Sequence, residues 1–140
     1  MTIPSLDDVR SVPLTDDESV RLRVADLLGR ALRHQLWLML LDADACQLPL
    51  LVPFEVPPIP ADDDAEPLAD LLREAAEACD AASAIIAFER PGRDALTRLD
   101  REWLRVAHDA ARLAGIPLRG PLLAHSRGVR WVAPEDYLLS

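Results

Sequence analysis

Hydrophobic and polar positions along this chain recur with two periods, one typical of strands and one typical of helices. The clearest stretch begins with an apolar run at 84–88 and continues, after a polar loop, into residues 98–114, where apolar side chains recur at steps of three and four. Thr97, with Asp100 three residues later, predicts a capped start for this helix, and Gly115 predicts its end. The predicted apolar face comprises Leu99, Trp103, Val106, Ala107, Ala110, Leu113 and Ala114.

The same periods predict further elements on both sides of this stretch. Helices are predicted at 15–32 (with a capping box that starts at Thr15) and 68–79, strands at 35–41, 47–52, 118–124 and 129–132, and one helical turn at 134–139. Pro49 and Pro121 lack a backbone N–H, so each predicts an edge position or a bulge in its strand. We expect residues 1–14 to be a loosely held lead-in and the proline-rich, acidic segment 53–67 to be an extended loop.

This order, α-β-β-α-β-α-β-β, predicts a single α+β domain over residues 15–140, with a small mixed sheet flanked by helices. Half of the 140 residues are hydrophobic, which is enough for a core of one domain. No apolar run is long enough to cross a bilayer, and the N-terminus lacks the basic and apolar regions of a secretory signal. We therefore expect a cytoplasmic protein without a membrane partner.

Cysteine and histidine usage does not indicate a metal centre. Cys46 and Cys79 lie far apart and are expected to be core residues rather than a disulfide. His34, His108 and His125 have no ligand partner at close spacing, and His108 is expected on the solvated face of its helix.

Two further patterns have a simpler structural interpretation. His125, Ser126 and Asp136 can be drawn as a catalytic set but fit a turn better, and Trp37, Trp103 and Trp131 fit core positions better than a base-stacking surface.

Charge is distributed unevenly along the chain, whose net charge is −9. Residues 1–80 carry 6 Arg and 17 Asp or Glu, a net charge of −11, whereas residues 81–140 carry 9 Arg and 7 Asp or Glu, a net charge of +2. The acidic half argues against broad nucleic-acid binding, which depends on neutralising phosphates. The arginines of the second half leave a local anionic partner open. All fifteen basic residues are arginine, which indicates codon bias in a GC-rich genome rather than a functional feature.

The loop before the long helix carries a specific pattern. It reads Phe-Glu-Arg-Pro-Gly at 88–92 and Thr-Arg-Leu-Asp at 97–100, and the helix ends in Gly-Ile at 115–116. This pattern resembles the JAB/MPN metalloproteases, most closely their bacterial RadC-type branch, in which a strand runs into His-x-His-Pro, a Gly-containing loop, Ser-x-x-Asp and a long helix that ends in Gly-Ile. The resemblance covers roughly residues 34–133 and implies a JAB/MPN-like fold.

The resemblance also implies that the family's zinc site is degenerate here. That site uses two His and one Asp as ligands, with an upstream Glu as general acid and base. Phe88 and Arg90 occupy the two His positions, Thr97 replaces the Ser, and only Asp100 remains among the ligands, while Glu55 is the nearest match to the upstream Glu. Phenylalanine has no lone pair to offer, and a guanidinium repels a dication. The resemblance therefore implies a chain that is not an enzyme and holds no metal or cofactor.

Two interpretations remain open for Asp100: it belongs to a residual functional site, or it is only part of a helix cap. Thr97 and Asp100 form an ordinary helix cap in any protein, so the pair need not be a remnant of catalysis. Arg90 and Asp100 stand at two family ligand positions and have opposite charges. We therefore expect a salt bridge between them in place of the metal.

For function, we expect a module that binds an unidentified protein partner. The predicted contact surfaces are the loop Glu89, Arg90, Pro91, Gly92 and Arg93, the acidic loop 61–66, and the sheet edges that contain proline; a homodimer through a sheet edge is left open. One alternative is a metal-dependent hydrolase with a site rebuilt around Asp100, Glu89 and Glu55. A further alternative is a DNA-associated role, by analogy with RadC-type proteins.

Overall fold

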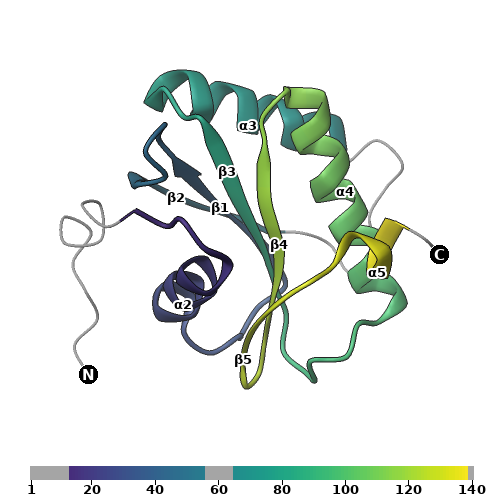
Figure 1. Cartoon of the computed structure of the whole chain (residues 1–140). Coiled ribbons are helices and arrows are strands. Elements are labelled where there is room, and N and C mark those ends of the chain that lie inside the picture. Colours follow the sequence, from purple (N-terminus) through teal and green to yellow (C-terminus); the bar gives the residue numbers. More distant parts are fainter. Residues whose placement is uncertain (1–12, 56–64, 139–140) are drawn as a thin grey trace.

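The computed structural model describes residues 13–55 and 65–138. Its elements, in chain order, are α2 (Asp17–Leu28), β1 (Gln35–Leu41), β2 (Gln47–Glu55), α3 (Ala65–Cys79), β3 (Ser83–Glu89), α4 (Arg98–Ala114), β4 (Leu118–His125), β5 (Gly128–Trp131) and α5 (Pro134–Leu138) (Figure 1). The lead-in before residue 13 and most of the acidic loop 61–66 lie outside the described residues.

The strands form one mixed sheet in the order β2-β1-β3-β4-β5. β1 is antiparallel to both β2 and β3, β3 is parallel to β4, and β4 is antiparallel to β5. The parallel pair requires a crossover connection, which α4 supplies. The prediction of an α+β chain with a mixed sheet flanked by helices is confirmed.

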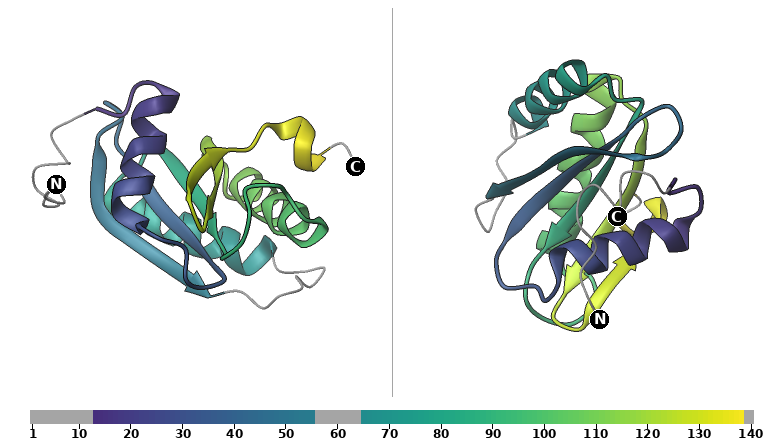
Figure 2. Two further views of the ribbon diagram at one scale, coloured as in Figure 1. Left: turned by 90° about the horizontal axis from the view of Figure 1, so that it is seen from below. Right: turned by 90° about the vertical axis from the view of Figure 1, so that its left-hand side faces the viewer.

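Helices cover both faces of the sheet (Figures 1 and 2). On β3, Ile85 and Ala87 pack toward α2, whereas Ile86 and Phe88 pack toward α3 and α4. Successive side chains on a strand point to opposite faces, so a strand covered on both sides must be apolar at every position. This arrangement explains the uninterrupted apolar run at 84–88.

None of the helices in the described residues has the length and apolar composition that a membrane span needs.

The ends of α4 follow the predicted capping chemistry. The Thr97 side chain accepts a hydrogen bond from the Asp100 N–H, and the Asp100 side chain accepts one from the Thr97 N–H. Gly115 takes the left-handed conformation at φ 73°. The capped start of α4 lies beside the end of β3, because Arg90, the residue after β3, contacts Asp100 in the first turn of α4.

The predicted apolar face of α4 was wrong in detail. On α4, Leu99 and Leu113 are 39% and 51% exposed, while Leu104 is fully buried. The buried face is Asp100, Trp103, Leu104, Ala107, Ala110 and Ala111. Spacing alone allowed either stripe, and packing against the sheet selected the one that places Asp100 inside.

The first helix also differs from the prediction at both ends. Its N-cap is Asp16 rather than Thr15, and the Asp16 side chain accepts from the Ser19 N–H. It ends at Leu28 instead of Leu32, because Gly29 has a positive φ of 61°. Leu32, the last residue of the predicted helix, is 73% exposed.

Both proline expectations for the strands agree with the sheet. β2, which contains Pro49, is the terminal strand of the described sheet. β4, which contains Pro121, is internal, and its register with β3 shifts between Ile85 and Ala87. Among the tryptophans, Trp103 is buried in the core, whereas Trp37 and Trp131 pack at its margin.

Candidate functional site

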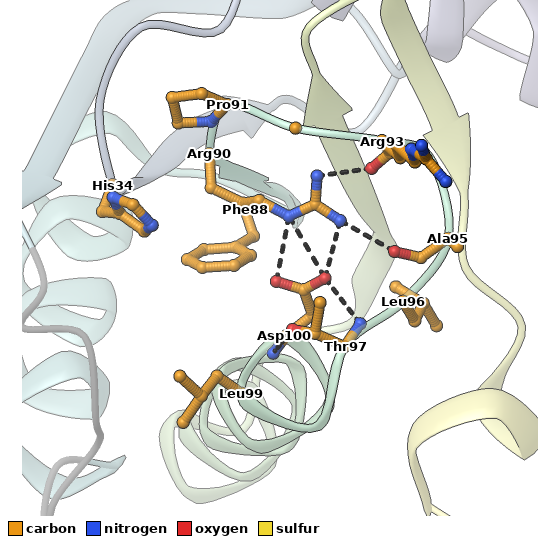
Figure 3. A pocket seen from close by; sticks show the side chains of 11 residues that line it. His34, Phe88, Arg90, Pro91, Arg93, Ala95, Leu96, Thr97, Leu99 and Asp100 are labelled. Carbon is orange, nitrogen blue, oxygen red and sulfur yellow. Dashed lines mark hydrogen bonds and ion pairs between the residues drawn. The ribbon is translucent and has the colours of Figure 1, made fainter.

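Arg90 and Asp100 form a buried ion pair between the end of β3 and the first turn of α4 (Figure 3). Nη2 of Arg90 lies 2.7 Å from Oδ2 of Asp100, and Nε lies 3.1 and 3.2 Å from the two carboxylate oxygens. The two side chains are only 6% and 4% exposed. The predicted salt bridge is therefore confirmed.

The Asp100 carboxylate serves the ion pair and the helix cap at once. Oδ2 also accepts the Thr97 N–H at 2.9 Å, and the Asp100 N–H donates to Thr97 Oγ1 at 3.1 Å. Both oxygens of the carboxylate therefore already accept hydrogen bonds. The predicted helix cap and the predicted salt bridge are therefore present together, on one carboxylate.

Guanidinium groups also determine the shape of the loop that follows β3. Arg90 donates through Nη1 to the Arg93 carbonyl and through Nη2 to the Ala95 carbonyl at 2.9 Å. Arg130, from β5, donates through Nη1 to the Asp94 carbonyl at 2.9 Å. Three successive carbonyls thus accept from arginines. The contribution of Arg130 was missed at the sequence level, since no local spacing connects residues so far apart in the chain.

The loop is also fastened to the β4–β5 turn. The Gly92 N–H donates to Ser126 Oγ at 2.7 Å, and the Ser126 N–H donates back to the Gly92 carbonyl at 3.0 Å. Gly92 has φ +124°, and a Cβ at this position would lie 3.1 Å from Nη1 of Arg90. Glycine is therefore required both by the backbone conformation and by the close approach of the guanidinium.

A pocket of about 450 Å³ opens over the ion pair. Apolar side chains of Phe88, Pro91, Leu96 and Leu99 line it together with Arg90 and Asp100 (Figure 3). His34 and Arg93 also line it. All four positions of the resembled pattern, Phe88, Arg90, Thr97 and Asp100, line this one pocket.

Glu89 lies on the opposite face of the sheet from Phe88. Its carboxylate accepts hydrogen bonds from the backbone N–H groups of Leu32 and Arg33 and from the side chains of Gln35 and Trp37, at 2.7–3.2 Å. Burial by itself raises the pKa of Glu89, but these hydrogen bonds outweigh it and hold the pKa below its ordinary value. The carboxylate fastens the segment after α2 to the end of β3.

These positions correct two sequence-level expectations. Glu89 and Arg90 are 4% and 5% exposed, so they are not surface contact residues, and only Pro91, Gly92 and Arg93 of the predicted interaction loop are exposed. The rebuilt hydrolase site is not assembled either. Glu89 faces away from Asp100, and Glu55 is exposed at the end of β2, 4.0 Å from Arg33. The described residues contain no group of three or more His, Cys, Asp or Glu side chains placed to hold a metal ion.

The other candidate chemistry is dispersed in the structure. Ser126 Oγ accepts from Gly92, while Asp136 lies 3.9 Å from Arg130, so neither forms a catalytic set with His125. His108, expected to be solvated, instead lies with Nδ1 3.3 Å from the hydroxyl of the buried Tyr137. Cys46 and Cys79 are free thiols at half-buried positions.

A second pocket, of about 520 Å³, adjoins the first and shares Gly92 and Arg93 with it. Its remaining lining residues are Asp94, His125, Ser126 and Arg127. Burial lowers the pKa of His125; the Asp94 carboxylate opposes this shift, and the guanidinium groups of Arg90 and Arg130 add to it. Nδ1 of His125 accepts the Arg127 N–H at 3.3 Å, so the neutral ring carries its proton on Nε2.

Comparison of the sequence with models of known protein families gave no match, and comparison with curated proteins gave none either.

Proposed function

We propose that this chain is a catalytically inactive, JAB/RadC-like module that acts by binding another protein. The observation that carries the proposal is the Arg90 guanidinium against Asp100, at two of the positions where the JAB/MPN pattern has metal ligands. Phe88, at the third ligand position, faces the same pocket as this pair.

The ion pair makes the site unsuited to a divalent cation. A guanidinium keeps its positive charge at every physiological pH, and it repels a second cation placed at the same carboxylate. The Asp100 oxygens already accept from Arg90 and from the Thr97 N–H, so a metal would have to displace buried hydrogen bonds. Releasing a buried charge from its partner is costly, which favours the present arrangement over a metal-loaded one.

The two pockets at this end of the sheet support a binding function. Two pockets adjoin there, and the loops that line them are fixed by hydrogen bonds from Arg90, Arg130 and Ser126. A surface that is already ordered loses little conformational entropy when a partner docks. Such preordered loops are expected at a surface that binds a partner, even though the site lacks catalytic groups.

The test is to restore the two histidines of the family pattern. The variant Phe88→His/Arg90→His presents two imidazoles beside Asp100, and it is expected to bind one zinc per chain. The wild-type chain and the triple variant that also carries Asp100→Ala are expected to bind none. Zinc content after dialysis and isothermal titration give the stoichiometry, and circular dichroism checks that each variant is folded.

The outcomes separate clearly. A folded double variant that binds no zinc would contradict the JAB-like geometry of the site. Stoichiometric zinc on the wild-type chain, lost in Asp100→Ala, would contradict the proposal of an inactive module and favour the hydrolase.

A further inference from the structure

The two adjoining pockets differ in chemistry. The first is walled by the apolar side chains of Phe88, Leu96 and Leu99. The second is lined by polar and charged residues from two loops, including Arg93 and Arg127. Because the pockets meet at Gly92 and Arg93, one short ligand can reach both.

Arginines at this end of the sheet have two kinds of role. The guanidinium groups of Arg90 and Arg130 donate to carbonyl groups of the loop and pair with aspartates. Arg93 and Arg127 are exposed, and their side chains make no hydrogen bond or ion pair with any residue that the structure describes. Two such cations that line one pocket repel each other, so an anionic group between them is favoured.

The loops that carry these two side chains are held together before any ligand binds. The reciprocal hydrogen bonds between Gly92 and Ser126 join them directly. The Arg90 N–H donates to the Ala124 carbonyl at 3.0 Å just before the turn. The backbone positions of the two arginines are therefore fixed relative to each other, and two guanidinium groups bind a carboxylate with charge-assisted hydrogen bonds.

The charge distribution limits the size of the anionic ligand. Residues 90–101 and 125–130 carry six arginines and two aspartates, a net charge of +4, whereas the chain as a whole carries −9. Asp94 lines the second pocket beside the arginines. An extended polyanion would meet this aspartate and then the acidic remainder of the chain, so a short acidic segment fits better than a nucleic acid.

We infer that this two-pocket surface binds a short segment of a partner protein in which an acidic side chain lies close to an apolar one. Arg93 and Arg127 receive the carboxylate, and the wall formed by Phe88, Leu96 and Leu99 receives the apolar side chain. Because the two pockets share Gly92 and Arg93, the acidic and the apolar side chain are expected close together in the sequence of the peptide. The inference rests on the proposed function, since it names the partner that an inactive module would bind.

The experiment is a selection from a random peptide library displayed on phage, with the full chain as bait. Selected peptides are expected to share an Asp or Glu close to a Leu, Ile, Phe or Met. Synthetic copies are then titrated by fluorescence polarisation. The variant Arg93→Glu/Arg127→Glu is expected to weaken binding by at least about tenfold, as is Leu99→Ser for the apolar side chain.

The matched control is Arg98→Glu/Arg101→Glu, which makes the same change of charge on α4, outside both pockets. This control is expected to change the affinity by less than about threefold, the effect of a surface charge that does not line either binding pocket. Equal weakening by the two double variants would overturn the inference, because it would show only a general effect of charge.

Two further outcomes would also overturn it. One is an enriched set of peptides without acidic residues. The other is binding of a double-stranded DNA oligonucleotide that depends on Arg93 and Arg127 while no peptide is enriched. The proposed function is judged separately: if the wild-type chain and the Arg93→Glu/Arg127→Glu variant bind the same purified partner equally, protein binding stands and this surface does not.

Discussion

Arg90 binds the same carboxylate oxygen that caps helix α4. Oδ2 of Asp100 lies 2.7 Å from Nη2 of Arg90 and 2.9 Å from the backbone nitrogen of Thr97. One buried oxygen therefore joins the end of β3 to the start of α4. A substitution at Asp100 removes the cap and leaves the guanidinium without its counter-charge at the same time.

This dual role predicts a large loss of stability in Asp100→Ala. Breaking a buried ion pair by removing one partner costs about 3–5 kcal/mol, because the remaining charge stays buried. We expect a loss in that range from urea denaturation followed by circular dichroism. Asp109→Ala is the matched control on the same helix, since Asp109 is 47% exposed and lies 3.8 Å from Arg112; its loss is expected to be less than about 1 kcal/mol. Equal losses in the two variants would show that the buried pair contributes nothing specific.

Glu89 predicts a pH-dependent contribution to stability. Its folded-state pKa is held below the ordinary value of 4.5, so its stabilising effect is present above that pH. The effect is lost as the pH falls through the folded-state pKa, because the unfolded chain then binds more protons than the folded one. Acid denaturation below about pH 4.5 is therefore expected to include this carboxylate.

The variant Glu89→Gln tests this contribution. It is expected to lower the free energy of unfolding by about 1–3 kcal/mol at pH 7, since the amide cannot accept all four hydrogen bonds. The difference from the wild type is expected to shrink toward pH 3. Glu77→Gln, at an exposed position of α3, is the control and should change little at either pH. A difference that stays constant with pH would contradict the assignment.

Pro53 limits the pairing of a second strand with the outer edge of β2. Its register partner is Trp37, and because proline has no N–H this must be a non-hydrogen-bonded pair of the antiparallel ladder. The nitrogen of Pro53 therefore faces the unpaired edge of the described sheet, where it offers no donor to a second strand. A homodimer through this edge is disfavoured at that position.

The variant Pro53→Val supplies the missing donor. We expect increased self-association, measured by sedimentation velocity over a range of concentrations. Pro13→Val, at an exposed position outside the sheet, makes the same substitution without altering the edge. If Pro53→Val sediments as the wild type does at every concentration, the proline is not what protects this edge.

Some features could be read from local patterns. The apolar run at 84–88 and the residues Thr97 and Gly115 predicted β3 and both ends of α4, because caps and buried strands depend on side chains close in sequence. The attraction between Arg90 and Asp100 was also expected, from opposite charges at two positions of a resembled pattern. What local patterns could not provide was the end of α2, since Leu32 fits the helical period although the chain turns at Gly29.

The sequence by itself determined the order and the approximate positions of the helices and strands, although residues 53–55 and 65–67, expected in a loop, belong to β2 and α3. Only the tertiary structure decided that Glu89 turns to the α2 face, that Arg130 holds the Asp94 carbonyl, and that Leu104 rather than Leu99 is buried. The physical reason is that hydrogen-bond partners and burial depend on contacts between residues far apart in the chain. Periodicity and capping report only on neighbours within one or two turns.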